Sequence, residues 1–260
     1  MKKIILCSLF LGSICNLSLS QVYTPNGTVV EAHTLSAGDV ALFEAQAAGW
    51  LADHNLTDSV QRVGAATREY NCHSFAWNIS EGGNNVWVNA FLDSDYNSFN
   101  PYNSNSIPPL PQNISKYWDD GSYIQVSNES LASKVWYGSC WTWTVYGWSD
   151  NCDHSAVRLS NGLYKSKWGA WPLYIHAYND CPYTWSNRKY YIKRPALSGP
   201  RNICGQETYT YTINLPNNIP VSWNVSSDIR IVSEQNNSVT VERNPNTYYM
   251  YTDSYIVADV

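Results

Sequence analysis

The segment that spans residues 154–168 constrains the fold more than any other part of this 260-residue chain. Two strand-like runs, 154–159 and 163–168, flank the dipeptide Asn161-Gly162. Asn-Gly between two such runs is the strongest short-range signal for a β-hairpin. Aromatic and β-branched residues also mark strands at 123–126, 134–137 and 141–146. The sequence therefore predicts an antiparallel sheet, with His154 at the start of one hairpin strand.

Two helices are predicted ahead of this sheet. Residues 34–53 carry a capping-box-like start, Ser36-Ala37-Gly38-Asp39, and an apolar stripe that we interpret as core packing. A second helix is expected to start at Asn71 or Cys72 and to end before Gly82-Gly83. Because asparagine is a favoured helix cap, Cys72 is placed in the first turn. The helix dipole and the free amides of that turn lower a thiol pKa and can hold an oxyanion.

Cys72 and His154 together indicate a cysteine hydrolase. A thiol needs a base to become a nucleophile at neutral pH, and histidine is the usual one. Two alternatives remain: a merely structural Cys72, and a zinc site formed by Cys72, His73, His154 and His176. These four residues lack the close paired spacing of a metal motif, so we expect no metal and no cofactor.

The segments Tyr70-Asn71-Cys72-His73-Ser74 and 153–162 resemble NlpC-type and CHAP-type peptidases and amidases of the papain-like superfamily. The resemblance covers roughly residues 60–180. It implies an α+β fold with an antiparallel sheet, with Cys72 as the nucleophile and His154 as the general base. The Asp-Cys-Ser-Gly motif usual in the family is replaced here by Asn71-Cys72-His73-Ser74, which indicates a divergent branch.

The resemblance implies a third catalytic position less clearly. The family places a polar side chain about twelve residues beyond the base, which is Ser166 here. A three-residue turn puts Ser166 on the face of His154, and a two-residue turn puts Lys167 there instead. His176 is chemically the better partner, and we favour it over Ser166. Asp153 is adjacent to the base but projects from the opposite face of an extended strand.

The first twenty residues have the pattern of a secretory signal peptide. A Met-Lys-Lys head precedes an apolar stretch, and Ser18-Leu19-Ser20 supplies small residues before a cleavage site. No later segment is long and apolar enough to span a bilayer. We expect a secreted, periplasmic or cell-surface protein. The absence of a basic patch argues against a nucleic-acid partner.

Five cysteines remain after removal of this signal, and an odd number suggests one free thiol in an oxidising compartment. Cys72 is the best candidate for that free thiol. Cys140 and Cys152 are close enough in sequence to form a disulfide that closes the loop between them. Cys181 and Cys204 are then left as a second pair, although the connectivity is not fixed by sequence.

The residue pattern of the chain changes near Pro195. Short alternating runs at 209–213, 221–225, 229–232, 239–241 and 255–258 predict a small β-sandwich. This part resembles the Ig-like or PKD-like modules of secreted proteins from Bacteroidota. We therefore predict a signal at 1–20, a papain-like hydrolase domain at 21–195 and an Ig-like module at 196–260. Glycan or cell-surface contact is the expected role of the module.

The expected reaction is cleavage of an amide bond in a peptidoglycan peptide, a protein or another amide. The 12 tryptophans and 20 tyrosines raise an alternative, a non-catalytic glycan-binding or adhesion protein with exposed aromatic rings. Residues 93–117 are rich in Asn, Ser and Pro. They form a long loop that either borders a substrate cleft or is simply exposed to solvent.

Overall fold

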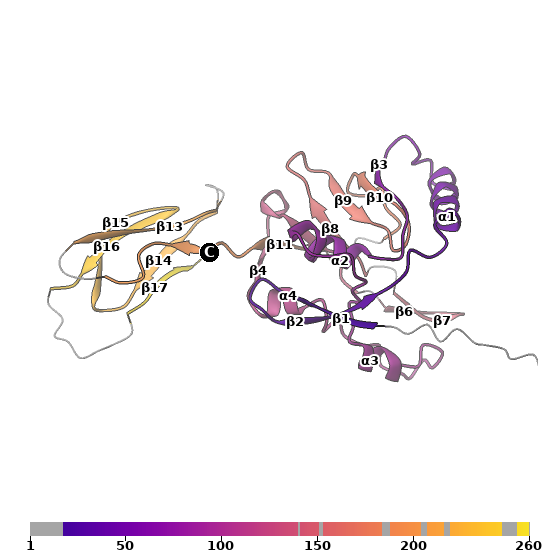
Figure 1. Cartoon of the computed structure of the whole chain (residues 1–260), viewed down its shortest axis with the longest axis horizontal. Coiled ribbons are helices and arrows are strands. Elements are labelled where there is room, and N and C mark those ends of the chain that lie inside the picture. Colours follow the sequence, from indigo (N-terminus) through magenta and orange to yellow (C-terminus); the bar gives the residue numbers. More distant parts are fainter. Residues whose placement is uncertain are drawn as a thin grey trace, which may run out of the picture. The chain divides into compact units, whose positions relative to one another are not determined.

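The computed structural model describes residues 18–139, 141–150, 153–183, 188–203, 207–215, 219–245 and 254–259 (Figure 1). The predicted signal peptide lies outside the described residues except for its last three positions, 18–20. Cys140, Cys152 and Cys204 also lie outside them.

The chain is mostly β, and the predicted papain-like α+β fold is wrong. Strands account for 34% of the chain and helices for 17%, in several antiparallel sheets. The longest described helix, α1 (Val40–Asp53), has 14 residues, whereas α2 (Cys72–Trp77) has six. Asn, Ser and aromatic residues weaken helix interiors and suit turns and strands, so this composition supports only short helices.

Contacts divide the chain into two units, which are described separately. The first holds the chain up to Asp120 and Lys134–Lys189; the second holds Gly121–Ser133 and the chain from Tyr190 onward. Besides α1 and α2, the elements of the first unit are β1 (Ser18–Tyr23), β2 (Val29–Thr34), β3 (Gln61–Gly64), η1 (Ile79–Glu81), α3 (Asp93–Ser98), α4 (Lys116–Asp119), β5 (Lys134–Trp136), β6 (Trp141–Thr144), β7 (Gly147–Asp150), β8 (Ser155–Arg158), β9 (Tyr164–Lys167) and β10 (Leu173–His176).

The first unit is built on antiparallel strands in the order β3-β10-β9-β8-β5. The predicted hairpin is confirmed as β8–β9. Its turn contains three residues between Leu159 and Leu163, since the Leu159 N–H donates to the Leu163 carbonyl at 2.8 Å. Gly162 has a φ of 83° there, a conformation that favours glycine. Helix α2 packs on β8 and β9 (Figure 1).

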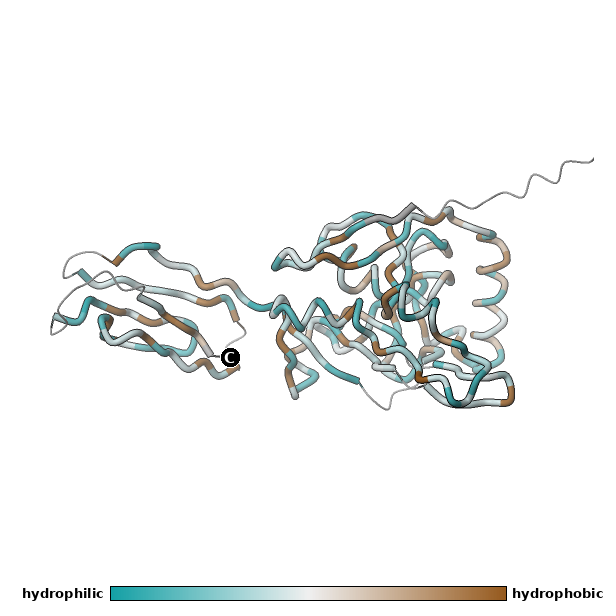
Figure 2. Tube along the Cα trace, turned by 90° about the horizontal axis from the view of Figure 1, so that it is seen from below, coloured by the Kyte–Doolittle hydropathy of each residue, from teal (hydrophilic) through white to brown (hydrophobic). Residues whose placement is uncertain are grey.

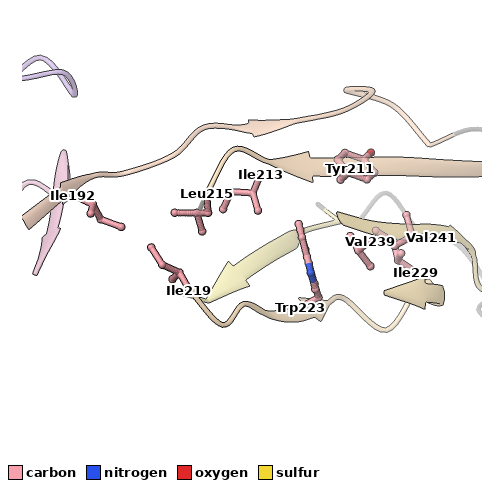
Figure 3. Packing of buried hydrophobic residues seen from close by; sticks show 9 residues of the cluster. All are labelled: Ile192, Tyr211, Ile213, Leu215, Ile219, Trp223, Ile229, Val239 and Val241. Atoms are coloured by element: carbon pink, nitrogen blue, oxygen red, sulfur yellow. The ribbon is translucent and has the colours of Figure 1, made fainter. Parts of the chain in front are cut away.

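The second unit is an all-β body with its own core. Its elements are β4 (Tyr123–Val126), η2 (Glu129–Leu131), most of β11 (Lys189–Lys193), β12 (Leu197–Ser198), β13 (Thr208–Ile213), β14 (Ser222–Val225), β15 (Ile229–Gln235), β16 (Ser238–Arg243) and β17 (Ile256–Asp259). The five predicted strand runs after Pro195 are confirmed as β13 to β17. Figure 3 shows Tyr211 and Ile213 facing Trp223 and Ile219 across the core of this unit.

Hydrophobic residues form short stretches along the described parts of the chain. Figure 2 shows them interspersed with hydrophilic segments, including along α1. Within the part of the chain that the structure describes, no helix has the length and apolar character needed to cross a membrane.

Candidate functional site

Cys72 lies at the first position of α2, where the sequence placed it. The Asn71 side chain caps the helix by accepting a hydrogen bond from the Ser74 N–H at 3.1 Å. The same side chain donates from Nδ2 to the Val88 carbonyl at 2.7 Å. One asparagine therefore fixes both the helix start and the segment that faces it. The Cys72 thiol is unpaired and buried, with 5% of the residue exposed.

A cavity of about 340 Å³ opens beside Cys72, wholly within the first unit. Cys72 and His73 line it from α2, and Asp153 lines it from the residue pair before β8. Much of the remaining wall is aromatic, with the rings of Trp87, Phe91, Tyr96 and Tyr183. Since Tyr96 belongs to α3, the long polar segment 93–117 does border the cavity at its start.

The Cys72 thiol is protonated in this resting arrangement. Burial, together with a smaller effect of the nearby Asp153 carboxylate, raises its pKa to about 12. The backbone N–H groups of Ser155, His73 and Cys72 itself act in the opposite direction, toward the thiolate. The expected effect of the helix start is therefore present, but burial outweighs it.

His73 connects α2 to the chain around β8. The Trp77 Nε1–H donates to Ser155 Oγ at 2.9 Å, and that oxygen lies 2.8 Å from His73 Nδ1. The Ser155 hydroxyl hydrogen is then free to be donated to Nδ1, which leaves the proton of a neutral imidazole on Nε2. His73 Nε2 lies 3.0 Å from Asp153 Oδ1. His73 therefore has a hydrogen bond at Nδ1 and a carboxylate oxygen close to Nε2.

His154 is fully buried and is not bonded to Cys72. Among the described residues, neither of its ring nitrogens has a hydrogen-bond partner. Its ring stacks on Tyr183 with centroids 3.8 Å apart and an interplanar angle of 8°. Burial lowers the His154 pKa well below 6.5, with smaller effects from His176 and His73. The imidazole is therefore neutral, and the predicted Cys72–His154 hydrogen bond is absent from this structure.

Strand alternation explains why the two side chains do not meet. Ser155 contacts His73 on α2, and the Lys165 ammonium lies 5.6 Å from the ring centroid of Phe75, also on α2. Val157 pairs with Lys165, so Ser155, Val157 and Lys165 share the face that α2 covers. Asp153 lies on this side as well, because it contacts His73.

The opposite face holds the other predicted site residues. Arg158 pairs with Tyr164, so His154 and Ser166 lie on that face by alternation. The three-residue turn thus places Ser166 on the face of His154, as predicted for that turn length. Ser166 Oγ lies 2.8 Å from His176 Nε2, while His176 Nδ1 bonds the Ala177 carbonyl at 2.8 Å. The two candidates for the third position therefore bind each other and not His154.

Sequence reasoning missed four residues at or beside the cavity. Asp153 was placed away from the site, Lys167 was considered only as the residue that a two-residue turn would put on the face of His154, and Ser155 and Tyr183 were given no role. The buried Lys167 ammonium donates to the carbonyls of Thr67 at 3.0 Å, Gly169 at 3.1 Å and Trp171. Burial lowers its pKa to about 7. The sequence shows that the side chains of Asp153 and Ser155 project to the opposite side from that of His154. It does not show which of the two sides α2 covers.

Cys181 is also a free, buried thiol. Its predicted partner, Cys204, lies outside the described residues. Over the described ranges, no cluster of three or more His, Cys, Asp or Glu residues is arranged to hold a metal ion. Comparisons of the chain with protein-family models, curated proteins and solved structures found no match. The geometry of the site is therefore the basis for any functional conclusion.

Proposed function

We propose that the protein is a cysteine-dependent hydrolase that cleaves an amide bond in a peptide or a peptidoglycan-type substrate, with Cys72 as the nucleophile. The observation that carries the proposal is the environment of the Cys72 sulfur. A free thiol lines a cavity of about 340 Å³, and backbone N–H groups of Ser155, His73 and Cys72 point toward it. Such N–H groups stabilise the negative charge that develops during attack on a carbonyl.

The proton acceptor in this proposal is His154. The N–H of Ser155 that reaches the Cys72 sulfur belongs to the peptide bond between His154 and Ser155. The backbone of His154 is therefore next to the thiol. Its imidazole is neutral and has no hydrogen-bond partner among the described residues. Leaving a buried polar group unpaired destabilises the fold, and a catalytic role explains why such a group is retained. The His154 ring lies on the face opposite α2, so to reach the sulfur the chain at His154 must rotate and the stacked Tyr183 ring must move.

The reaction follows from these protonation states. A thiol with a pKa of about 12 beside a weakly basic imidazole does not form a resting ion pair. The proton therefore passes to His154 as Cys72 Sγ bonds the carbonyl carbon. The imidazolium returns that proton to the leaving amine when the C–N bond breaks, which leaves a thioester. Water, deprotonated by His154, then attacks the thioester and releases the acid and the thiol.

Labelling of the native protein with a chloroacetamide probe, mapped by peptide mass spectrometry, tests the nucleophile. We expect labelling at Cys72, none at this site in Cys72→Ala, and a rate at least about a hundredfold lower in His154→Gln. Cys181→Ala is the matched control, because this thiol is equally buried and its pKa is also raised to about 12. His73→Asn tests the competing imidazole.

Two results would overturn the assignment. If Cys72 and Cys181 react at the same slow rate in the folded protein, Cys72 is a structural thiol. If His73→Asn slows the labelling and His154→Gln does not, the proton acceptor is His73, with Asp153 as its partner.

The alternative of a non-catalytic glycan-binding protein is favoured by one feature. Trp143 and Tyr146 on the β6–β7 hairpin are 47% and 87% exposed, and Tyr102 is 80% exposed. Exposed rings of this kind stack on sugars. Glycan binding by the wild type, unchanged in Cys72→Ala and accompanied by no amide cleavage, would favour this alternative.

A further inference from the structure

We infer that the cavity beside Cys72 binds a protonated alkylamine, and that Asp153 and the aromatic wall recognise its charge. The site combines a carboxylate with several aromatic rings in one enclosed space. The identification of this amine as part of a hydrolysed substrate rests on the proposed function. The binding of the cation does not.

The carboxylate of Asp153 retains an open acceptor. Oδ1 lies 3.0 Å from His73 Nε2, but this buried oxygen accepts no hydrogen bond from the residues that the structure describes. The Asp153 side chain keeps 22% of its surface exposed, so a ligand in the cavity can reach it. An ammonium group is the natural partner for this oxygen, because a charge-assisted hydrogen bond is about twice as strong as a neutral one.

The aromatic rings of the cavity also favour a cationic ligand. Trp87, Phe91 and Tyr96 line the cavity together with Asp153. The negative potential on the face of an aromatic ring attracts an alkylammonium group, most strongly where the cation has lost its water. The Trp87 indole N–H donates to Asn89 Oδ1 at 3.1 Å, which fixes the edge of this ring.

No competing cation lines the cavity. Among its described lining residues there is no lysine or arginine. Lys167 is the buried cation next to this region, and its ammonium donates to three backbone carbonyls, including that of the lining residue Gly169. These carbonyls use all three of its N–H donors, so none is left for Asp153 or for a ligand in the cavity. Apart from the imidazole of His73, the carboxylate of Asp153 is the one ionic group that an alkylammonium ligand meets among the described lining residues.

The volume of the cavity sets the size of the ligand. About 340 Å³ is at the small end of the range for small-molecule sites, so the cavity holds one residue-sized group. A substrate consistent with this site carries a free amine, on a side chain or at an amino terminus, close to the amide that Cys72 attacks.

The test is a pair of probes that differ only in charge, titrated calorimetrically into Cys72→Ala protein so that no turnover occurs. The cationic probe is N-acetyl-lysine methylamide, and the neutral one is N-acetyl-6-hydroxynorleucine methylamide. We expect the cation to bind at least about tenfold more tightly at pH 8 and low salt. Equal affinities, or no binding of either probe at millimolar concentration, would overturn the inference.

Further variants, made in the Cys72→Ala protein, test which residues cause the tighter binding of the cationic probe. Asp153→Asn should abolish it, whereas Asp53→Asn, an exposed carboxylate at the end of α1, should leave it intact. Tyr96 is 56% exposed, so Tyr96→Leu keeps the fold and should weaken cation binding at least about threefold. Tyr102→Leu, outside the cavity, is its control. A preference that survives both Asp153→Asn and Tyr96→Leu would refute this site.

Different results would overturn the proposed hydrolase activity and the proposed binding of an alkylamine. Charge-selective binding without any labelling of Cys72 would leave an amine-binding site in a protein that is not a hydrolase. Labelling of Cys72 without charge selectivity would leave a hydrolase whose substrate is not recognised by an amine.

Discussion

His176 shows what burial does to a single imidazole in this protein. Its residue exposure is 1%, and burial lowers its pKa from 6.5 to about 4. The folded state therefore takes up this proton only near pH 4, whereas the unfolded state takes it up near pH 6.5. Between these values the unfolded state binds more protons, so the free energy of unfolding falls as the pH falls.

The resulting prediction concerns His176→Gln. The wild type should lose about 3 kcal/mol of stability through this one group between pH 6.5 and pH 4, and the variant should lose that much less. Urea unfolding at several pH values in this range measures the difference. His54→Gln, at an exposed histidine, is the control. An unchanged pH dependence in His176→Gln would contradict the role of burial.

Among the individual elements, α2 depends most on one side chain. Asn71 accepts from the N–H of Ser74 and of Val88 and donates to the Val88 carbonyl, all in a buried position. Asn71→Ala should lower the free energy of unfolding by about 2 to 3 kcal/mol, because a cap is lost and a buried carbonyl is left without its donor.

The comparison for this prediction is Asn128→Ala. Asn128 caps η2 by accepting from the Ser130 N–H at 2.9 Å, but it is exposed. Its loss should lower stability by about 1 kcal/mol or less. Equal effects of the two substitutions in thermal unfolding would show that the Val88 bond contributes nothing.

The local signals in the sequence predicted individual elements well. Asparagine at a cap, Asn-Gly in a hairpin and alternation after Pro195 each act over a few residues, and the structure has α2, β8–β9 and β13 to β17 at these places. The first helix begins at Val40 and not at residue 34, since Asp39 caps it by accepting from the Leu42 N–H. Of its predicted apolar stripe, Ala47 and Leu51 are buried, whereas Leu42 is 49% exposed.

Long-range arrangement was not predictable in the same way. The side of the hairpin that α2 covers depends on how the helix returns to the sheet. Alternation of Asp153, His154 and Ser155 was therefore predictable, but which of these side chains lies on the side of Cys72 was not. Residues 121–133 belong to the second unit because β4 pairs with β11, with Ile124 opposite Ile192. No local pattern marks that pairing.

At the scale of the whole molecule, the state of the cysteines decides whether the proposed chemistry is available. Both cysteines among the described residues, Cys72 and Cys181, are free. When the unreduced protein is unfolded in iodoacetamide, both should be alkylated in full, as peptide mass spectrometry will show. Before unfolding, both should react slowly at pH 8, because burial raises each pKa to about 12. Cys72 should be the faster, since it lines the cavity. A disulfide-linked peptide that contains Cys72 would exclude it as the nucleophile, whereas one that contains only Cys181 would contradict its free state and leave the proposed reaction intact.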